Sequence, residues 1–410
     1  MWLLDKMLRR LVRSGELIAI EASGKHRRYG APDPARDPVV IRFTDRGAPN
    51  FIARNPRLGA AEAWMDGRMV IDQGDILALL DLIRSNAPWE KGGSGLSGST
   101  SKRAFHAISA WADRFNWARR SKRNVAHHYD LDDRLYDLFL DADRQYSCAY
   151  FTDPANSLEQ AQADKKAHIA AKLYLKPGQR VLDIGCGWGG LALYLNRVAD
   201  VDVLGITLSE EQLKVARRRA EEAGVANRVK FELIDYRAVE GRFDRIVSVG
   251  MFEHVGPPHY RRFFAKCRSL LAEDGVMLLH TIGRMGKPGT TDAFTAKYIF
   301  PGGYIPALSE VIAASEQVKL IASDVETLRL HYGLTIEHWY ARTIAARDRI
   351  EKLYDARFYR LWLFYLAGAI VTFRRGGMCN YQVQYIRRRD ALPITRDYMR
   401  EAEAGLGAAV

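Results

Sequence analysis

Cysteine and long hydrophobic runs are both scarce in this chain of 410 residues. The four cysteines show neither the pairing pattern of a disulfide-stabilised domain nor the close spacing of a metal site. The longest apolar run, Leu361–Phe373, is well short of the roughly 20 residues that span a bilayer, and it favours a buried helix over an interfacial one. No secretory signal pattern opens the sequence. We therefore expect a cytoplasmic protein with no membrane-spanning helix and no bound metal.

Positive charge, in contrast, is in excess. Lysine and arginine number 61 against 49 acidic residues, which gives a formal net charge of +12. This excess favours an anionic partner, either nucleic acid or phospholipid head groups. A cluster of basic residues at 114–123 is open to two interpretations. It is either a solvated helix face or a contact with an anionic membrane, where each basic side chain contributes about 1 kcal/mol.

A glycine-rich stretch, VLDIGCGWGG at Val181–Gly190, has the pattern of a strand that turns sharply into a helix. Gly185 and Gly187 let the backbone approach a ligand, Asp183 ends the strand, and the helix start offers free N–H groups to an anionic group. A nucleotide-like ligand is therefore predicted. Thr207 stands where a dinucleotide-binding protein has its ribose-binding acid, and there is no P-loop Lys-Ser/Thr pair. The spacing resembles the S-adenosylmethionine (SAM) loop of Rossmann-like methyltransferases.

Strand and helix patterns alternate between about residues 172 and 279. They predict an α/β fold with a parallel-dominated sheet and crossover helices. We expect a small α+β domain at 1–85, a glycine- and serine-rich linker at 86–103 and a catalytic domain at 104–410. Within the catalytic domain, the segment at about 284–308 is rich in glycine and proline and predicts a lid over the site.

Polar residues lie at the ends of several of these strands. Asp235 closes the third strand, and Glu253 and His280 follow at the ends of later ones, at the edge where open α/β sheets bind ligands. Gln212 lies three residues after a helix start at Ser209, so it is either half of a capping box or a ligand. A lone buried histidine is more often a satisfied core residue, but several such groups around one cofactor loop indicate a site.

The order and spacing of nine motifs resemble the cyclopropane-fatty-acyl-phospholipid synthases. That family includes the mycolic-acid cyclopropane synthases and related lipid C-methyltransferases. The motifs are HHYDLDDRLYDLFLD, QYSCAYF, VLDIGCGWGG, GITLS, DYR, MFEHVG, LLHTIG, KYIFPGG and HYGLTIEHW. The resemblance covers the chain from about residue 124 onward, and QYSCAYF and KYIFPGG are more specific than the SAM loop. The N-terminal domain before a linker is similar to the architecture of the full-length bacterial phospholipid enzymes.

The resemblance implies two sites. The SAM site is expected to comprise Asp183, the carboxylate at the end of the first strand, together with the residues that the resemblance implies. These are Tyr146, Ser147, Gly185, Gly187, Thr207, Gln212, Asp235 and Tyr236. The catalytic site is implied to hold a bicarbonate ion through Cys148, Glu253, His280, the backbone at Ile282, and Tyr332. The implied substrates are unsaturated acyl chains of membrane phospholipids, with the protein peripherally associated with the inner membrane and forming a homodimer.

The implied reaction sets clear physical demands. A cis double bond is a weak nucleophile, and its attack on the methyl group of a sulfonium leaves a carbocation that must lose a proton before a ring can close. We therefore expect a dry acyl channel and a base near the developing charge.

Three alternatives remain beside ring formation. Methyl-branched acyl chains share the first step, and small-molecule N-methyltransferases share the fold but do not need a basic surface or an N-terminal domain. A non-catalytic lipid-binding protein would not need the intact loop and the bicarbonate-binding residues. A nucleic-acid substrate is not expected, because FEHVGPPHY stands where amino-methylating enzymes carry a D/N-P-P-Y/F motif.

Overall fold

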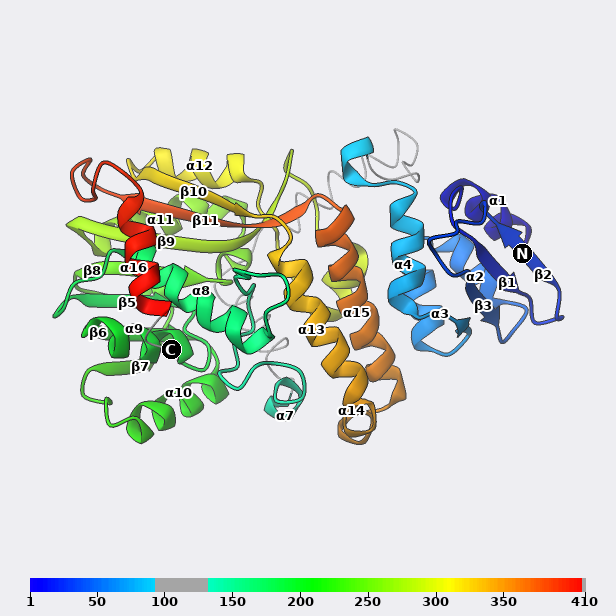
Figure 1. Cartoon of the computed structure of the whole chain (residues 1–410), viewed down its shortest axis with the longest axis horizontal. Coiled ribbons are helices and arrows are strands. Elements are labelled where there is room, and N and C mark those ends of the chain that lie inside the picture. Colours follow the sequence, from blue (N-terminus) through cyan, green and yellow to red (C-terminus); the bar gives the residue numbers. More distant parts are fainter. Residues whose placement is uncertain (93–131, 408–410) are drawn as a thin grey trace. The chain divides into compact units, whose positions relative to one another are not determined.

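The computed structural model describes residues 1–92 and 132–407, which form two compact units (Figure 1). Among the described residues, the first unit comprises 1–92, 292–299 and 336–377, and the second comprises 132–291, 300–335 and 378–407. Most of the expected linker and the whole basic cluster at 114–123 lie outside the described residues. The sequence predictions for those two segments therefore stay predictions.

The first unit combines a small mixed sheet with helices. Its elements are α1 (Trp2–Leu11), β1 (Leu17–Ile20), β2 (His26–Tyr29), β3 (Val39–Phe43), α2 (Ala48–Arg54), α3 (Gly59–Met65), β4 (Met69–Gln73), α4 (Ile76–Ser85), η1 (Trp89–Lys91), the π-helical turn η5 (Thr295–Ile299), most of α13 (His331–Ala345), α14 (Arg347–Leu353) and α15 (Ala356–Arg375). The strand order is β2-β1-β3-β4, with β1 and β3 parallel. Asp75 caps the start of α4, because its carboxylate accepts a hydrogen bond from the N–H of Ala78 at 2.7 Å.

The apolar run Leu361–Phe373 lies within α15, and Trp362 and Ile370 on this helix are fully buried. α15 packs against α3 and α4, so the prediction of a buried helix is confirmed. The sequence analysis placed 292–299 and 336–377 with the catalytic domain. In the structure these segments belong to the first unit, because the apolar face of α15 needs a partner and the helices of the N-terminal segment supply it.

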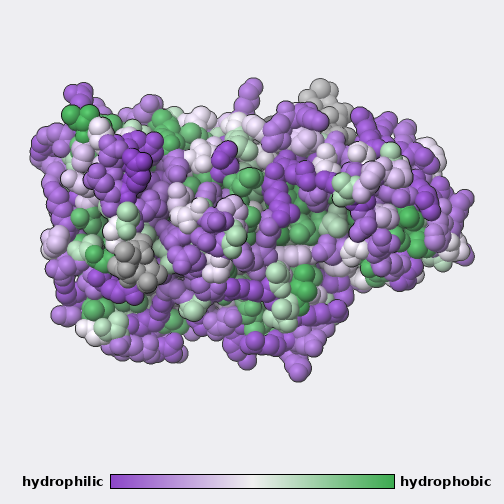
Figure 2. Space-filling view, in the orientation of Figure 1, coloured by the Kyte–Doolittle hydropathy of each residue, from purple (hydrophilic) through white to green (hydrophobic). Residues whose placement is uncertain are grey.

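The surface in view is mostly hydrophilic, with hydrophobic residues in small patches among polar ones (Figure 2). Within the described residues, the structure has no helix with the length and hydropathy that a bilayer crossing requires. α15 has 20 residues but carries arginines in its first and last turns. Its apolar stretch is therefore too short for a span, in agreement with the sequence prediction.

The second unit is a seven-stranded α/β sandwich. Its elements are α7 (Asp133–Tyr136), α8 (Leu158–Leu173), β5 (Arg180–Ile184), α9 (Gly190–Ala199), β6 (Asp202–Thr207), α10 (Glu210–Glu222), β7 (Val229–Leu233), η2 (Tyr236–Ala238), β8 (Phe243–Val249), η3 (Phe252–His254), η4 (Pro257–His259), α11 (Tyr260–Leu270), β9 (Leu271–Arg284), α12 (Leu308–Glu316), β10 (Ile321–Leu328), β11 (Met378–Ile386) and α16 (Asp397–Gly407). The strand order is β10-β11-β9-β8-β5-β6-β7. The five strands from β9 to β7 are parallel, whereas β11 is antiparallel to both of its neighbours.

Two apolar layers cover the faces of this sheet. On one face, residues of α11 and α12 pack on the sheet around Phe263 and Val311. On the other face, residues of α8, α9 and α10 pack around Ile169, Leu195 and Ala216. The strand order reverses at β5, which lies between β6 and β8, and this is where open α/β sheets bind ligands. The parallel-dominated α/β fold predicted from the sequence is confirmed.

Candidate active site

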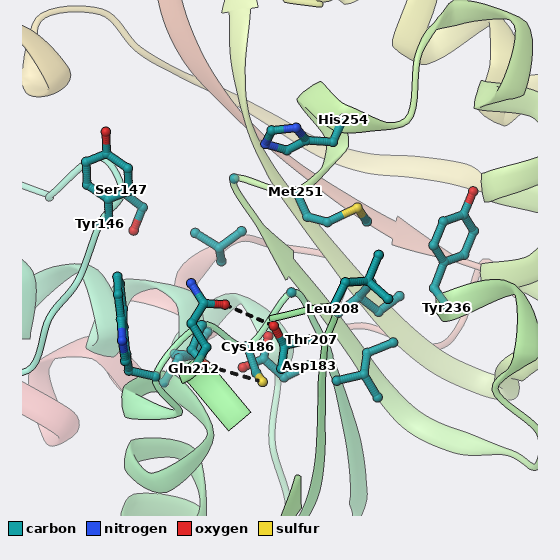
Figure 3. Close-up of a pocket in the computed structure, with 18 of the residues that line it drawn as sticks. Tyr146, Ser147, Asp183, Cys186, Thr207, Leu208, Gln212, Tyr236, Met251 and His254 are labelled. Atoms are coloured by element: carbon teal, nitrogen blue, oxygen red, sulfur yellow. Dashed lines mark hydrogen bonds between the residues drawn. The ribbon is translucent and has the colours of Figure 1, made fainter. Parts of the chain in front are cut away.

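A pocket opens at the carboxyl ends of the strands around β5 (Figure 3). All nine residues expected for SAM line it: Tyr146, Ser147, Asp183, Gly185, Gly187, Thr207, Gln212, Asp235 and Tyr236. They come from the segment before α8, from β5 and the loop after it, from the end of β6 and start of α10, and from the turn after β7. The structure thus brings together side chains that are up to 90 positions apart in the sequence. Their ligand-binding roles remain predictions.

The glycine loop owes its shape to backbone conformations that other residues rarely adopt. Gly185 has a φ of +87°, and a Cβ there would lie 2.9 Å from the Cβ of Met251. Gly187 has a φ of +55°, with nothing within 4 Å of its notional Cβ. The loop then leads into α9, which begins at Gly190 beside the pocket. This position suits the predicted contact between the free N–H groups of the helix start and an anionic group, which stays a prediction.

Thr207 and Gln212 form a buried pair at the pocket wall. The hydroxyl of Thr207 donates to Oε1 of Gln212 at 2.9 Å, as Figure 3 shows. The backbone N–H of Gln212 meanwhile donates to the Ser209 hydroxyl, which caps α10. The two interpretations of Gln212 are therefore compatible, because its main chain completes the cap while its side chain lies in the pocket.

Asp183 and Lys165 are buried ionisable groups on the pocket floor. Burial raises the pKa of Asp183 to about 7, with Lys165 opposing the shift, and its Oδ2 has no hydrogen-bond partner. Lys165 donates to Oε1 of Gln145 at 2.6 Å and to the hydroxyl of Ser147 at 2.9 Å. Burial lowers the pKa of Lys165 to about 8. Lys165 thus supports the segment that carries Tyr146 and Ser147.

Asp235 and Tyr236 form the far wall. Burial opposes ionisation of Asp235, but hydrogen bonds from Arg237 outweigh it and hold its pKa below the usual value. Nε of Arg237 donates to Oδ1 at 2.7 Å and Nη2 to Oδ2 at 2.5 Å. The Tyr236 ring packs edge-on against Phe263 at 5.2 Å, and burial raises its pKa to about 12. Asp235 is therefore a fixed, ionised acceptor, and Tyr236 is a neutral phenol.

The five residues expected to hold bicarbonate lie outside the lining of this pocket. Glu253 lies in η3 just after β8, and its Oε1 accepts a hydrogen bond from the backbone N–H of Ile282 at 2.5 Å. Its Oε2 is buried without a hydrogen-bond partner. Burial raises the pKa of this carboxyl to about 7. The segment around Tyr304 also contacts Glu253, because the N–H of Tyr304 donates to the carbonyl oxygen of Glu253 at 2.9 Å.

His280 lies on β9 with its ring between two amides of β11. The Asn380 amide lies 3.3 Å from Nε2, and the Gln382 amide lies 3.1 Å from Nδ1. Burial, and then the nearby Lys165 and Lys172, lower the pKa of His280 to about 3. The imidazole is therefore neutral. The sequence analysis did not identify Asn380, Gln382 or Lys172.

Hydrogen bonds from backbone N–H groups to side chains join the segments that carry Cys148 and Tyr332. The N–H of Ala149 donates to the Thr335 hydroxyl at 3.0 Å, and the N–H of Phe151 donates to Nδ1 of His331 at 3.0 Å. Cys148 is 1% exposed and Tyr332 is 7% exposed. Burial raises the pKa of the Cys148 thiol, so it is protonated and weakly nucleophilic. The start of α13 thus holds the loop that carries Cys148.

The sequence signals for the missed residues were weak for a physical reason. Lys165 lies on α8 between Ala161 and Ile169, which are both fully buried one turn away. That helical spacing could have identified Lys165 as a buried residue. Asn380 and Gln382 alternate with apolar residues along β11, a pattern that is typical of a solvent-facing strand. No sequence pattern indicated that both faces of β11 are covered.

Comparison with known proteins places the chain in a family. A sequence model of the family described as mycolic acid cyclopropane synthetase matches residues 117–383. The chain belongs to this family. It is 39% identical over 353 residues to the cyclopropane-fatty-acyl-phospholipid synthase of Escherichia coli K12, which covers 85% of this chain and 88% of that protein. It is 40% identical over 292 residues to a probable fatty acid methyltransferase of Pseudomonas putida, over 68% of this chain and 74% of that protein.

A solved member of the mycolic acid cyclopropane synthetase family matches the fold as well. The structure of mycolic acid cyclopropane synthase CmaA1 complexed with SAH and CTAB matches with a TM-score of 0.62 and 33% identity. The match covers 64% of this chain and 97% of that chain. The resemblance inferred from the sequence motifs and the methyltransferase fold are therefore both confirmed.

Proposed function

We propose that this family member is a cyclopropane-fatty-acyl-phospholipid synthase. It transfers a methylene group from SAM to the cis double bond of unsaturated acyl chains in membrane phospholipids. The observation that carries the proposal is the buried contact between Glu253 and Ile282. It places a carboxyl group with a raised pKa and a free oxygen in the same unit as a SAM-type pocket.

The pocket residues fit SAM by their chemistry. The glycine loop and the start of α9 present N–H groups, and Thr207 and Gln212 offer hydroxyl and amide groups suited to a ribose. Asp235 offers a carboxylate that can accept from an adenine amino group. Ser147, held by Lys165, and Tyr146 would contact the methionine part. When bound, SAM supplies an electrophilic methyl group on a sulfonium.

The second group of residues fits a small oxyanion. Oε2 of Glu253 is unpartnered, and with a pKa of about 7 this carboxyl can carry a proton and donate it in a hydrogen bond. The neutral His280, the protonated thiol of Cys148 and the Tyr332 phenol are further polar groups without negative charge. We propose that these residues, with the Ile282 backbone, hold a bicarbonate ion. When bound, bicarbonate supplies a base close to the reacting carbons.

The residues around this site also exclude water. Glu253, His280 and Cys148 are at most 7% exposed, and Thr281 is fully buried. A carbocation in such a place is protected from water, which would otherwise convert it to an alcohol. We propose that Glu253 and His280 orient the proton acceptor and keep its surroundings dry.

Incubation with vesicles tests the proposed function. We would incubate the protein with methyl-labelled SAM and phosphatidylglycerol vesicles that carry cis-unsaturated chains, with saturated-chain vesicles as the control. Label in the fatty acids of the unsaturated vesicles alone is the expected result. Label on added amines, or none in the lipid from a protein that binds SAM, would overturn the proposal.

A methyl-branched product is the second candidate, favoured by the similarity to the probable fatty acid methyltransferase. Both reactions begin with methyl transfer to the double bond and form the same carbocation. They differ in the fate of the carbocation: loss of a proton from the transferred methyl group with ring closure gives a cyclopropane, whereas loss of a proton without ring closure leaves an unsaturated methyl-branched chain. We favour ring closure because identity to the cyclopropane-fatty-acyl-phospholipid synthase is 39% over 85% of this chain, against 32% over 93% for a tuberculostearic acid methyltransferase of Mycobacterium tuberculosis.

We further propose that the protein works as a homodimer, peripherally bound to the cytoplasmic face of the inner membrane. The net charge of +12 suits an anionic lipid surface. The substrate chains lie within a bilayer, so the protein must contact one to reach them.

A further inference from the structure

A chain of polar side chains leads from His280 into the layer between β11 and α8. The Gln382 amide lies 3.1 Å from Nδ1 of His280. On its other side, Oε1 of Gln382 accepts from Nζ of Lys172 at 2.7 Å. Lys172 also donates to the carboxylate of Glu326. His280, Gln382 and Lys172 are all at most 2% exposed.

The direction of these hydrogen bonds follows from Lys172. Its partner Glu326 is ionised, because hydrogen bonds from His168 and the charge of Lys172 lower its pKa to about 2 against the effect of burial. Burial lowers the pKa of Lys172, but the adjacent Glu326 carboxylate opposes this shift and favours the ammonium, which only donates. The amide of Gln382 must then turn its oxygen toward Lys172 and its NH₂ toward His280. Consequently Nδ1 of His280 is an acceptor and carries no proton.

Asn380 supports the same conclusion from the other side of the ring. Its Nδ2 lies 3.3 Å from Nε2 of His280, and its Oδ1 is buried without a hydrogen-bond partner. A neutral imidazole has a single acceptor nitrogen, so it cannot receive N–H donors from Gln382 and Asn380 at once. Amide orientation is assigned from such networks, and turning Asn380 by 180° places its oxygen against Nε2–H.

We propose that Lys172 and Gln382 are positioning residues that hold His280 in the neutral form with its proton on Nε2. This deepens the proposed function and rests on it, because a proton on Nε2 lets His280 donate a hydrogen bond to an oxyanion in place of the Asn380 oxygen. An unprotonated Nε2 would repel the same anion. The tautomer, however, is set by the protein alone and exists without any ligand.

The part of this hydrogen-bonded series that is farthest from His280 holds Lys172 in place. The Glu326 carboxylate accepts from Nε2 of His168 at 2.7 Å, and Nδ1 of His168 lies 3.1 Å from Glu403 on α16. The Tyr150 ring stacks on His168 at a centroid distance of 4.0 Å. The C-terminal helix thus supports the position of a residue that acts through Gln382 on His280.

The tautomer can be measured directly by NMR on the full-length protein with ¹⁵N-labelled histidine. The chain has ten histidines, so the signals of His280 are those that vanish in the His280→Asn variant. We expect one ring nitrogen with the shift of a protonated nitrogen, assigned to Nε2 by its carbon-proton couplings, and an unprotonated Nδ1. A protonated Nδ1 in the unsubstituted protein would overturn the proposal, whether or not the protein makes cyclopropane lipids.

Gln382→Glu is the variant designed to reverse the tautomer. A carboxylate at this position can still accept from Lys172, but its second oxygen can only accept from His280, which must then be protonated on Nδ1. We expect the NMR signature to switch, and kcat to fall about 10²-fold or more with KM for SAM unchanged. Gln317→Glu places the same charge at an exposed position after α12, and should keep the proton on Nε2.

Lys172→Met gives an independent readout if the buried carboxylate prevents folding. Without the ammonium, the Gln382 amide is free to turn, so His280 should show a mixture of tautomers and a lower kcat. Lys176→Met, at an exposed position just after α8, is the matched control and should change neither. A single Nε2–H tautomer in the folded Lys172→Met variant would contradict the positioning role. Failure of the lipid assay in the unsubstituted protein would count against the proposed function only.

Discussion

The backbone N–H of Ile282 donates a hydrogen bond to Oε1 of Glu253, and the two atoms are 2.5 Å apart. This contact joins the turn after β8 to the end of β9, two neighbouring parallel strands. It fixes one oxygen of the carboxyl group and leaves the other, Oε2, buried and unpartnered. Burying the unpartnered Oε2 of Glu253 lowers the stability of the fold, and such unfavourable burial of a polar group is typical of catalytic sites.

The cost of this arrangement predicts a pH-dependent effect of Glu253→Gln on stability. The folded protein holds the Glu253 proton up to a pKa of about 7, whereas the unfolded chain releases it near 4.5. Between these values the folded state binds more protons, so stability falls as pH rises. The glutamine of the variant cannot titrate. The free energy of unfolding of the variant, relative to that of the unsubstituted protein, should therefore grow by about 3 kcal/mol between about pH 5 and pH 8, while activity is lost.

Urea unfolding of both proteins at the two pH values measures this difference. Asp183 titrates in the same range but is present in both proteins, so its effect cancels. A stability difference that does not change with pH would show that Glu253 is ionised in the folded protein.

Gln212 should bind SAM through its side chain only. Gln212→Ala removes the amide that Thr207 contacts, and we expect the Kd for SAM to rise about tenfold, equivalent to about 1.4 kcal/mol. Ser209→Ala removes the cap of α10 and should destabilise the fold by about 1 kcal/mol with little change in Kd. Calorimetric titration together with thermal unfolding separates the two effects. An equal loss of affinity in both variants would mean that Gln212 acts only through the helix start.

Glu62 should hold the segment that contains η5 within the first unit. Its carboxylate accepts from Nζ of Lys297 at 2.7 Å and from the Tyr298 hydroxyl at 2.8 Å. Glu62→Ala should therefore increase amide exchange in residues 292–299 several-fold and leave the Kd for SAM unchanged. Asp72→Ala, which removes an exposed ion pair with Arg42 in the same unit, is the control. Unchanged exchange in Glu62→Ala would show that the ring contact of Phe294 with Phe364 suffices.

Activity on vesicles should depend on salt if the positive charge attracts the protein to anionic lipid. Raising the ionic strength from about 0.05 M to 0.5 M shortens the screening length several-fold and should lower the rate on phosphatidylglycerol vesicles strongly. The rate on the same lipid dispersed in neutral detergent should change little. An equal fall in rate in both assays would show that salt lowers the activity of the enzyme itself and not its attraction to the vesicle surface.

The SAM half of the site could be predicted because its residues lie in short motifs at strand ends. Gly185 directly follows β5, Thr207 ends β6 and Asp235 lies two residues after β7, and parallel strands deliver their ends to one edge. Glu253 was recognisable for the same reason, because it follows β8. His280, which was expected at a strand end, lies inside β9 opposite the last residue of β8, and the family resemblance added the roles of both residues.

The supporting residues could not be predicted in this way. Lys172 and Gln382 are 210 positions apart and meet only because β11 inserts antiparallel between β9 and β10 beneath α8. Neither residue type is commonly buried. The sequence also did not predict which helices pack on α15, because its apolar face fits any apolar surface of suitable size. Local patterns predicted the elements, but not which distant element covers them.

The most direct test of ring formation uses SAM with a trideuterated methyl group and vesicles of cis-unsaturated phosphatidylglycerol. One deuteron must leave before the ring closes, so the account predicts acyl chains that gain one carbon with two deuterons, as a cyclopropane ring. Mass spectrometry of the fatty acids and NMR of the ring carbons measure both features. Chains that retain all three deuterons, or that remain unchanged while SAM is bound, would contradict it.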